Sequence, residues 1–343
     1  MNIPALLNTL GSRSWTLPIV ILYVTEGCNM RCITCSYRNA PPGELSLDEI
    51  RQIAGQLTGR GLRQIVFSGG EPLTRRDFPE ICRLFHGLGV HGTLLTNGLL
   101  LEKRYHEVGT YLREIIVSLD GPNEEIHDAI RGCESFRRIL RGIRDVVASP
   151  GRPQVSIRTV IQKRNFRSII TMVDFARELG VDRISFLAAD VLSGSFGRKG
   201  AGSPSSYDGV TLSQDETAEF RTLVAHMASQ CAAEFRSGFI AESPEKINRM
   251  AAYYEALLGK SPFPPTHCNA PMVSTVITST GELLPCFFLP AFARLREGPI
   301  AHLLNRAQIR DTREAVRNGT QERCKTCVCT LHVSPASALG GRF

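Results

Sequence analysis

The chain has 343 residues, with 40 lysines and arginines against 33 aspartates and glutamates, a net charge of +7 and 43% hydrophobic residues. This composition is sufficient for a hydrophobic core, and it excludes a disordered, collagen-like or coiled-coil chain. The apolar runs fall far short of the roughly 20 residues that span a bilayer, and the N-terminus does not resemble a secretory signal. We therefore expect a cytoplasmic protein without a membrane span.

Eleven cysteines are the most informative part of the composition. In a reducing compartment, clustered cysteines indicate metal binding or catalysis more often than disulfides. Their odd number in a chain of this length also argues against a disulfide scaffold.

Six short apolar runs alternate with amphipathic stretches, which predicts strands at 18–24, 64–67, 91–96, 114–119, 154–161 and 183–187. Capping boxes predict helices after Ser46, paired with Glu49, and after Asp77, paired with Glu80. A further helix is expected to end at Gly180. Alternating strands and helices imply parallel βα units, in a doubly wound sheet or a partial barrel. Active sites of both folds lie at the carboxyl ends of the strands.

The second half of the chain changes character at residues 192–206, where Gly, Ser and basic residues predict a flexible loop, either a lid over a substrate pocket or a plain linker. Helices are expected at 213–235 and 243–258, and a hairpin within 272–288. The predicted organisation is an N-terminal segment at 1–16, a core at 17–235, a helical connection at 236–262, a cysteine-containing unit at 263–335 and a tail at 336–343.

The first cysteine group is Cys28, Cys32 and Cys35, directly after the first predicted strand. Three thiolates in one loop can ligate three irons of a [4Fe–4S] cluster and leave the fourth iron open to a substrate. A structural zinc site would require a fourth Cys or His nearby. None lies within twenty residues of this group.

This C-x3-C-x2-C spacing after a first strand resembles the signature of the radical S-adenosylmethionine (SAM) superfamily. The sequence Ser68-Gly69-Gly70-Glu71 after the second strand is similar to the GGE motif of the same family. The resemblance implies an α/β fold with a partial (β/α)6 TIM-like barrel and a [4Fe–4S] cluster that binds SAM. It also implies that the GGE segment binds the methionine amino group, since close backbone approach favours glycine and an ammonium favours a carboxylate.

The resemblance extends to residues after the third and fourth strands. Thr96 and Asn97 are candidate SAM contacts, and Ser118 and Arg131 match the serine and arginine that hold the SAM carboxylate and ribose in the family. The alternative interpretation of the last two is a turn serine and a surface arginine.

Two features depart from the family pattern. Thr34 stands where an aromatic residue commonly borders the adenine, and Tyr37 is the candidate substitute. The glycine-rich adenine motif near the fifth strand is not recognisable in Val160-Ile161-Gln162.

The second cysteine group resembles the C-terminal SPASM extension of radical SAM enzymes, or its shortened twitch form. It comprises Cys268, Cys286, Cys324, Cys327 and Cys329, which implies one auxiliary [4Fe–4S] cluster. We expect the first four as ligands, with Cys329 as the alternative to Cys327. Zinc bound by four thiolates is the other use of such spacing.

The remaining cysteines are isolated. Cys82 lies in a predicted amphipathic helix and is expected in the core. Cys133, close to Arg131, is a weak candidate for a catalytic hydrogen donor, and Cys231 has no assigned role.

The resemblance implies a radical SAM oxidoreductase or biosynthetic enzyme. Such an enzyme cleaves SAM reductively and uses the 5′-deoxyadenosyl radical to abstract a substrate hydrogen, with the auxiliary cluster handling an electron. The positive charge suits an acidic donor such as flavodoxin or ferredoxin. We expect a monomer that does not bind nucleic acid, because Lys and Arg are dispersed.

Two substrate classes remain open at this stage. About twenty-seven residues precede Cys28, too few for a peptide-recognition domain, which favours oxidation or rearrangement of a small-molecule biosynthetic intermediate. The alternative is modification of a peptide or protein residue by a thioether, a C–C crosslink or dehydrogenation. A zinc-binding interaction protein and a nucleic-acid-modifying enzyme are the hypotheses from other classes.

Overall fold

The computed structural model describes residues 3–198, 207 and 209–341. One sheet of nine strands organises it, in the order β6-β5-β4-β3-β2-β1-β7-β8-β9. The strands are β1 (Ile19–Thr25), β2 (Gln64–Gly69), β3 (His91–Thr96), β4 (Leu112–Ser118), β5 (Gln154–Ile161), β6 (Arg183–Ala188), β7 (Ser274–Ile277), β8 (Glu282–Leu284) and β9 (Ala293–Arg294).

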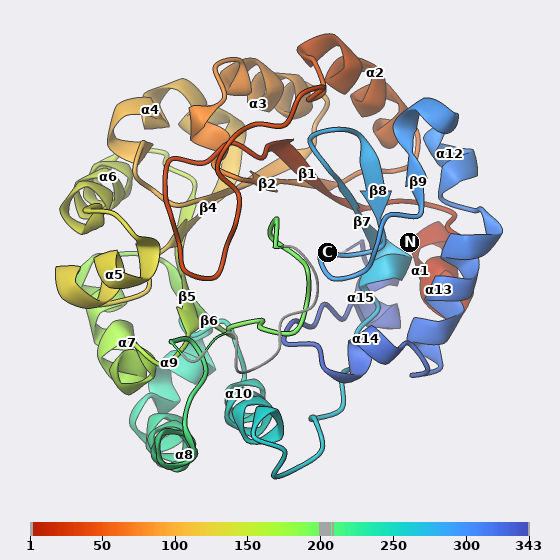
Figure 1. The fold of residues 1–343 in the computed structure, drawn as a ribbon. Coiled ribbons are helices and arrows are strands. Elements are labelled where there is room, and N and C mark those ends of the chain that lie inside the picture. The colour runs from red at the N-terminus through yellow and green to blue at the C-terminus, as the bar shows by residue number, and fades with distance from the viewer. Residues whose placement is uncertain (1–2, 199–206, 208, 342–343) are drawn as a thin grey trace.

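Helices surround the strands as an outer ring (Figure 1). Those before β7 are α1 (Ile3–Leu10), α2 (Leu47–Thr58), α3 (Phe78–Gly87), α4 (Leu101–Val108), α5 (Glu124–Arg131), α6 (Phe136–Ala148), α7 (Ile169–Glu178), α8 (Gln214–Gln230), α9 (Ala232–Ser237), α10 (Pro244–Leu257) and α11 (Ala270–Val273). After β9 come α12 (Ile300–Leu303), α13 (Ala307–Arg317), α14 (Glu322–Lys325) and α15 (Pro335–Leu339). Across the described ranges, no helix combines the length and apolar character needed to cross a bilayer.

The six predicted strands are confirmed, with ends that differ by no more than two residues, and all six run parallel as β1 to β6. The predicted hairpin is also confirmed, since β7 and β8 pair antiparallel around Gly281. However, β7 pairs in parallel with β1, so the C-terminal strands extend the same sheet. With β6 and β9 at its two edges the sheet is open, which makes the fold a partial barrel.

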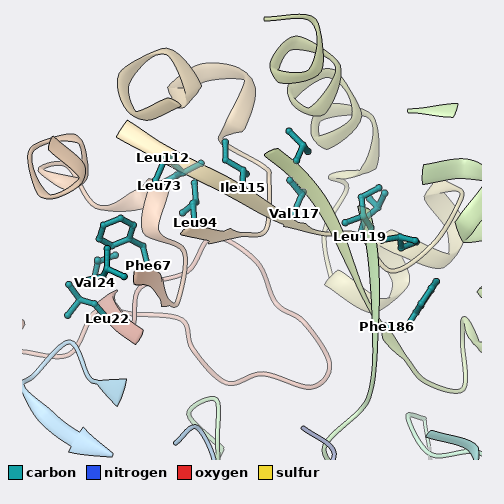
Figure 2. Close-up of a cluster of buried hydrophobic side chains, with 14 of the residues drawn as sticks. Leu22, Val24, Phe67, Leu73, Leu94, Leu112, Ile115, Val117, Leu119 and Phe186 are labelled. Atoms are coloured by element: carbon teal, nitrogen blue, oxygen red, sulfur yellow. The ribbon is translucent and has the colours of Figure 1, made fainter. Parts of the chain in front are cut away.

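The strands alternate between an apolar outer face and a more polar inner face. On β1, Leu22 and Val24 belong to the main core under the helices, whereas Tyr23 packs in a separate cluster on the inner side. The outer face is tightly packed, because the Phe67 ring of β2 meets the rings of Phe78 and Phe85 on α3 edge-on. Figure 2 shows this layer of buried side chains between strands and helices. The helices therefore hold the sheet from outside, and the inner face is left for chemistry.

Two helix predictions need correction. The Ser46 capping box forms, but the Asp77 side chain makes no capping hydrogen bond. Its carboxylate instead pairs with the Arg75 guanidinium at 2.6 Å, a stronger charged partner than a backbone amide. The single helix expected at 213–235 is interrupted at Cys231, which separates α8 from α9.

Candidate functional site

The first cysteine loop is held against the end of β2 by backbone contacts. The amides of Gly70 and Glu71 donate to the carbonyls of Thr25 and Gly27 at 2.7 and 2.8 Å. A Cβ atom on Gly69 would lie 2.1 Å from the Thr25 oxygen, and one on Gly70 would lie 2.1 Å from the Gly27 oxygen. Both glycines are thus required by the approach of the loop itself, before any ligand is considered.

Glu71 joins the ends of β2 and β3. Its carboxylate is fully buried and accepts hydrogen bonds from the Leu73 amide at 3.0 Å, the Thr96 hydroxyl at 2.8 Å and the Asn97 amide at 2.7 Å. Burial raises the pKa of Glu71 to about 7, and these three donors oppose the rise. Thr96 and Glu71 therefore contact each other, and their part in SAM binding stays a prediction.

Two side chains, one just after β3 and one at the end of α5, reach the cysteine sulfurs. The Asn97 amide nitrogen lies 3.8 Å from Cys28 Sγ, and Arg131 Nη1 lies 3.8 Å from Cys32 Sγ. Arg131 is also paired with the Asp120 carboxylate at 2.7 Å, and both side chains are largely buried. The arginine is thus an interior residue, so the surface-arginine interpretation is wrong, while its role toward SAM stays a prediction.

The backbone after α5 also supports this loop. The amides of Arg31 and Ile33 each donate at 3.1 Å, to the carbonyls of Arg131 and Ile130 respectively. Gly132 has a φ of +71°, and a Cβ there would lie 2.3 Å from the Arg31 oxygen. The C-terminus of α5 therefore docks directly on the cysteine loop.

The described part of the predicted loop lies over the third cysteine. The Cys35 thiol and the Ser36 amide both donate to the Phe196 carbonyl, at 3.6 and 2.9 Å. Within the described residues, Phe196 is the one non-glycine residue with positive φ, at 62°. The Ser195 hydroxyl donates to the Phe287 carbonyl at 2.7 Å, which ties this segment to the C-terminal unit. Residues 199–206 of the predicted loop lie outside the described residues.

Tyr37 and Thr34, the two positions that depart from the family pattern, differ in their surroundings. The Tyr37 ring meets the Tyr23 ring edge-on at 6.2 Å, and Gly197 packs on it. Thr34 forms no side-chain hydrogen bond with a described residue. Ser68 and Ser118 lie on the inner face, beside Tyr23 of β1 and Arg158 of β5.

The second cysteine group surrounds one cavity of about 80 Å³. All five predicted candidates line it: Cys268, Cys286, Cys324, Cys327 and Cys329. The rest of the wall is mostly apolar, including Phe287 and Phe288, and burial raises the pKa of Cys286 to about 12 and that of Cys324 to about 11. Residues separated by about sixty positions in the chain are thus brought to one enclosed space.

Both cysteine groups have the donor chemistry of iron–sulfur clusters. Three thiols on one loop leave one corner of a cluster for a ligand, and four of five thiols around an apolar cavity can complete a second cluster. Among the described residues, no three Cys, His, Asp or Glu side chains converge on a position for a single ion. Ligands spread around a volume fit a polynuclear cluster better than one zinc ion.

Arg323 connects the cavity to the barrel. It lines the cavity and pairs with the Asp190 carboxylate, which follows β6, at 2.8 Å. The same carboxylate pairs with Arg198, while Arg323 Nε is buried without a hydrogen-bond partner among the described residues. Neither Asp190 nor Arg323 was predicted, because an ion pair 133 positions apart leaves no local pattern in the sequence.

The remaining cysteines behave differently from one another. Cys82 is buried in α3 and packs in the main core, as predicted. Cys133 is half-buried beyond α5, and the Cys32 thiol contributes to raising its pKa, so the two lie near each other. Cys231 ends α8 and is buried.

A larger cavity, of about 960 Å³, lies elsewhere. It is lined by residues at the amino ends of the strands, such as Gln64, His91 and Arg113, at the end of the barrel opposite the cysteine loops. The cysteines that could ligate iron–sulfur clusters therefore identify the candidate site better than the size of a cavity does.

Comparison with known families finds two matches in this chain. A model of the radical SAM superfamily matches residues 22–186, and a model of an iron–sulfur cluster-binding domain, SPASM, matches residues 268–328. The first matched region contains Cys28, Cys32 and Cys35, and the second contains every cysteine of the second group except Cys329.

Comparison with individual proteins gives more distant similarities. An AdoMet-dependent heme synthase of Methanosarcina barkeri is 29% identical over 83% of this chain and 81% of its own length. An Fe-coproporphyrin III synthase of the same organism is 34% identical over 49% of this chain, which spans 43% of that relative. The crystal structure of Streptococcus suis SuiB bound to precursor peptide SuiA has a TM-score of 0.62 at 17% identity, covering 94% of this chain and 75% of SuiB. That last similarity concerns the fold alone.

Proposed function

Because this chain belongs to the radical SAM superfamily and carries a C-terminal SPASM-type iron–sulfur domain, we propose that it oxidises or rearranges a small-molecule biosynthetic intermediate. The reaction class is radical SAM chemistry, in which a [4Fe–4S] cluster supplies the electron that cleaves SAM. The resulting 5′-deoxyadenosyl radical abstracts a hydrogen atom from the substrate.

The observation that carries the proposal is the position of Tyr23 between the two cysteine groups. Its buried hydroxyl has a raised pKa, mainly through burial, and the thiols of Cys35 and Cys286 both contribute to the rise. The Tyr23 ring stacks on Phe287, which lines the auxiliary cavity, at 6.2 Å. Both cysteine groups therefore lie near the same part of the barrel interior. An enzyme that couples hydrogen abstraction to electron removal requires such an arrangement.

Residue roles follow from this arrangement. We propose Cys28, Cys32 and Cys35 as ligands of the SAM cluster, and Cys268, Cys286, Cys324 and Cys327 as ligands of the auxiliary cluster. The residues that would contact SAM are Ser68, Gly69, Gly70, Glu71, Thr96, Asn97, Ser118 and Arg131. Of these, Glu71, Thr96 and Arg131 would also hold the strand ends and the cysteine loop in place. Exclusion of water from such a site protects a radical, and the Phe196 segment covers Cys35 in a way that supports this role.

A carboxylate-bearing tetrapyrrole is the substrate class that we propose to test first. Two relatives of this chain are a heme synthase, similar over 83% of the chain, and an Fe-coproporphyrin III synthase, 34% identical over 49% of it. We further propose a flavodoxin or ferredoxin as electron donor and a monomeric enzyme.

The test uses anaerobically reconstituted protein with SAM, dithionite and Fe-coproporphyrin III. The proposal predicts more 5′-deoxyadenosine than in the porphyrin-free reaction and a change in the mass of the porphyrin. Unchanged porphyrin with unchanged 5′-deoxyadenosine would contradict the substrate class. A mass change in an added cysteine-rich peptide instead would indicate the peptide-modifying alternative.

A further inference from the structure

Arg158 places a positive charge inside the barrel, and no described acidic residue pairs with it. On β5, Val155, Ile157 and Ile161 pack in the core under the helices, so the alternating position of Arg158 faces the interior. Its one side-chain hydrogen bond to a described residue is from Nε to the Ser185 hydroxyl, at 3.4 Å. Both terminal nitrogens of the guanidinium remain without a partner among the described residues.

Three other arginines of this region are neutralised by carboxylates. Arg131 pairs with Asp120, and Arg198 and Arg323 share Asp190. An interior cation normally gains a counter-charge, because removing it from water is costly. Arg158 forms no such pair with a described residue; Arg38 does not either, but its guanidinium donates to the carbonyls of Tyr37 and Cys32.

A chain of hydrogen bonds fixes the direction of Arg158. The Ser185 hydroxyl, which accepts from Arg158 Nε, donates in turn to the Glu242 carboxylate at 3.0 Å. The second oxygen of Glu242 accepts from the Phe186 amide at 2.8 Å. With Nε held on the β6 side, the two terminal nitrogens are left to bind a planar two-oxygen group.

The location of Arg158 is that of a substrate contact. In the sheet register it lies between Ser118 of β4, a proposed SAM contact, and Ser185 of β6. It also acts electrostatically on the half-buried Cys329 thiol, which lines the auxiliary cavity, as do Lys246 and Glu242. A molecule bound at Arg158 would thus have the SAM site on one side and the auxiliary cysteines on the other.

We propose that Arg158 binds a carboxylate of the substrate in the barrel interior. The inference rests on the proposed function, and it adds that an acid group of the substrate is bound before hydrogen abstraction. SAM also carries a carboxylate, which could bind the Arg158 guanidinium in the same way. The experiment therefore measures binding of the substrate and of SAM separately.

The experiment measures binding to the reconstituted holoenzyme with two porphyrin probes, Fe-coproporphyrin III and its neutral tetraamide. We expect wild type to bind the tetracarboxylate about tenfold or more tightly than the tetraamide. Arg158→Met should weaken tetracarboxylate binding by about tenfold or more, while tetraamide and SAM binding change by less than about twofold. The affinity of Arg158→Lys for the tetracarboxylate should lie between those of wild type and Arg158→Met, because lysine keeps the charge but not the fork of donors.

Controls separate binding from folding. Arg144 is an exposed residue on α6, so Arg144→Met removes one positive charge without touching the interior and should bind both probes as wild type does. Iron content should equal wild type in all three variants, and porphyrin-free 5′-deoxyadenosine formation should equal wild type in Arg144→Met.

Each other outcome has a distinct meaning. Weaker SAM binding with unchanged porphyrin binding in Arg158→Met would assign the guanidinium to the SAM carboxylate and overturn the proposal. No change for either ligand would also overturn it. If wild type formed 5′-deoxyadenosine but did not prefer the tetracarboxylate, both the tetrapyrrole substrate class and the carboxylate contact with Arg158 would be contradicted. Absence of 5′-deoxyadenosine from wild type would instead contradict the proposed function itself.

Discussion

Asp190 and Arg323 form an ion pair at 2.8 Å that joins the end of β6 to the helix carrying Cys324. The Asp190 side chain is 3% exposed and also neutralises Arg198, which is 6% exposed. The pair therefore links the barrel to the auxiliary cysteine unit and balances two arginines with one carboxylate.

Replacement of Asp190 should destabilise the folded protein. Asp190→Asn leaves the buried Arg198 without its counter-charge, which is expected to lower the free energy of unfolding by roughly 3 kcal/mol. Urea unfolding of the cluster-free protein measures this. In the matched control, Glu124→Gln removes the exposed pair with Arg137 and should leave the transition unchanged. Equal effects of the two substitutions would contradict the assigned importance of Asp190.

The glycines of the GGE segment give a second prediction. Gly70→Ala would place a Cβ 2.1 Å from the Gly27 oxygen and displace the loop that carries Cys28. We expect a loss of roughly 2 kcal/mol or more in stability, together with loss of the SAM cluster, measured by iron content. Gly55→Ala on the exposed side of α2 meets no atom within 4 Å and should stabilise the protein by about 0.5 kcal/mol. A Gly70→Ala protein with full iron content would show that the loop tolerates displacement.

Glu71 makes stability depend on pH. Its pKa in the folded protein is about 7, above the ordinary value of 4.5, so between these values the folded state binds more protons than the unfolded state. The contribution of this group is therefore greatest below pH 4.5 and declines as pH rises to about 7, by roughly 3 kcal/mol in total.

Glu71→Gln removes this titration. The difference in unfolding free energy between wild type and variant, measured in cluster-free protein, should become less favourable to wild type as pH rises through this window. A difference that stays constant, or that changes in the opposite direction, would contradict the assigned burial of the carboxyl.

The identity of the fourth auxiliary ligand can be tested with two single substitutions. Both Cys268 and Cys286 act electrostatically on the Cys327 thiol, whereas of these two only Cys268 is among the groups that act on Cys329. Cys329 instead lies near Arg158 and Lys246. Cys327→Ala should therefore reduce iron from about eight to about four per chain, and Cys329→Ala should retain about eight. The reverse pattern would assign Cys329 as the ligand.

The fold was largely predictable because its elements have local signals. Alternating apolar runs predicted all six parallel strands, and the Ser46 box located the start of α2. The Asp77 box failed because an arginine two positions earlier competes for the carboxylate, a contest that spacing rules do not include. Pairing of β7 with β1 could not be predicted, since it joins residues more than 250 positions apart.

The candidate site was predictable where chemistry is concentrated in short motifs. The two cysteine groups and the GGE segment are of this kind, whereas Asp190 and Arg323 meet only in the folded chain. Arg158 is intermediate: the alternation of β5 already places it opposite Val155 and Ile157, so its interior position could have been predicted from the sequence. That Arg158 has no acidic partner among the described residues could not have been predicted, because this depends on side chains from β6 and from the segment before α10.

The central claim is that Cys28, Cys32 and Cys35 hold the cluster at which SAM is cleaved. The most direct measurement is 5′-deoxyadenosine formed from SAM and dithionite by reconstituted wild type and by the triple variant Cys28→Ala/Cys32→Ala/Cys35→Ala. We expect wild type to form 5′-deoxyadenosine and the triple variant to form none, while the variant retains about four irons in the auxiliary site. Release of 5′-deoxyadenosine by the triple variant at the wild-type rate would contradict it.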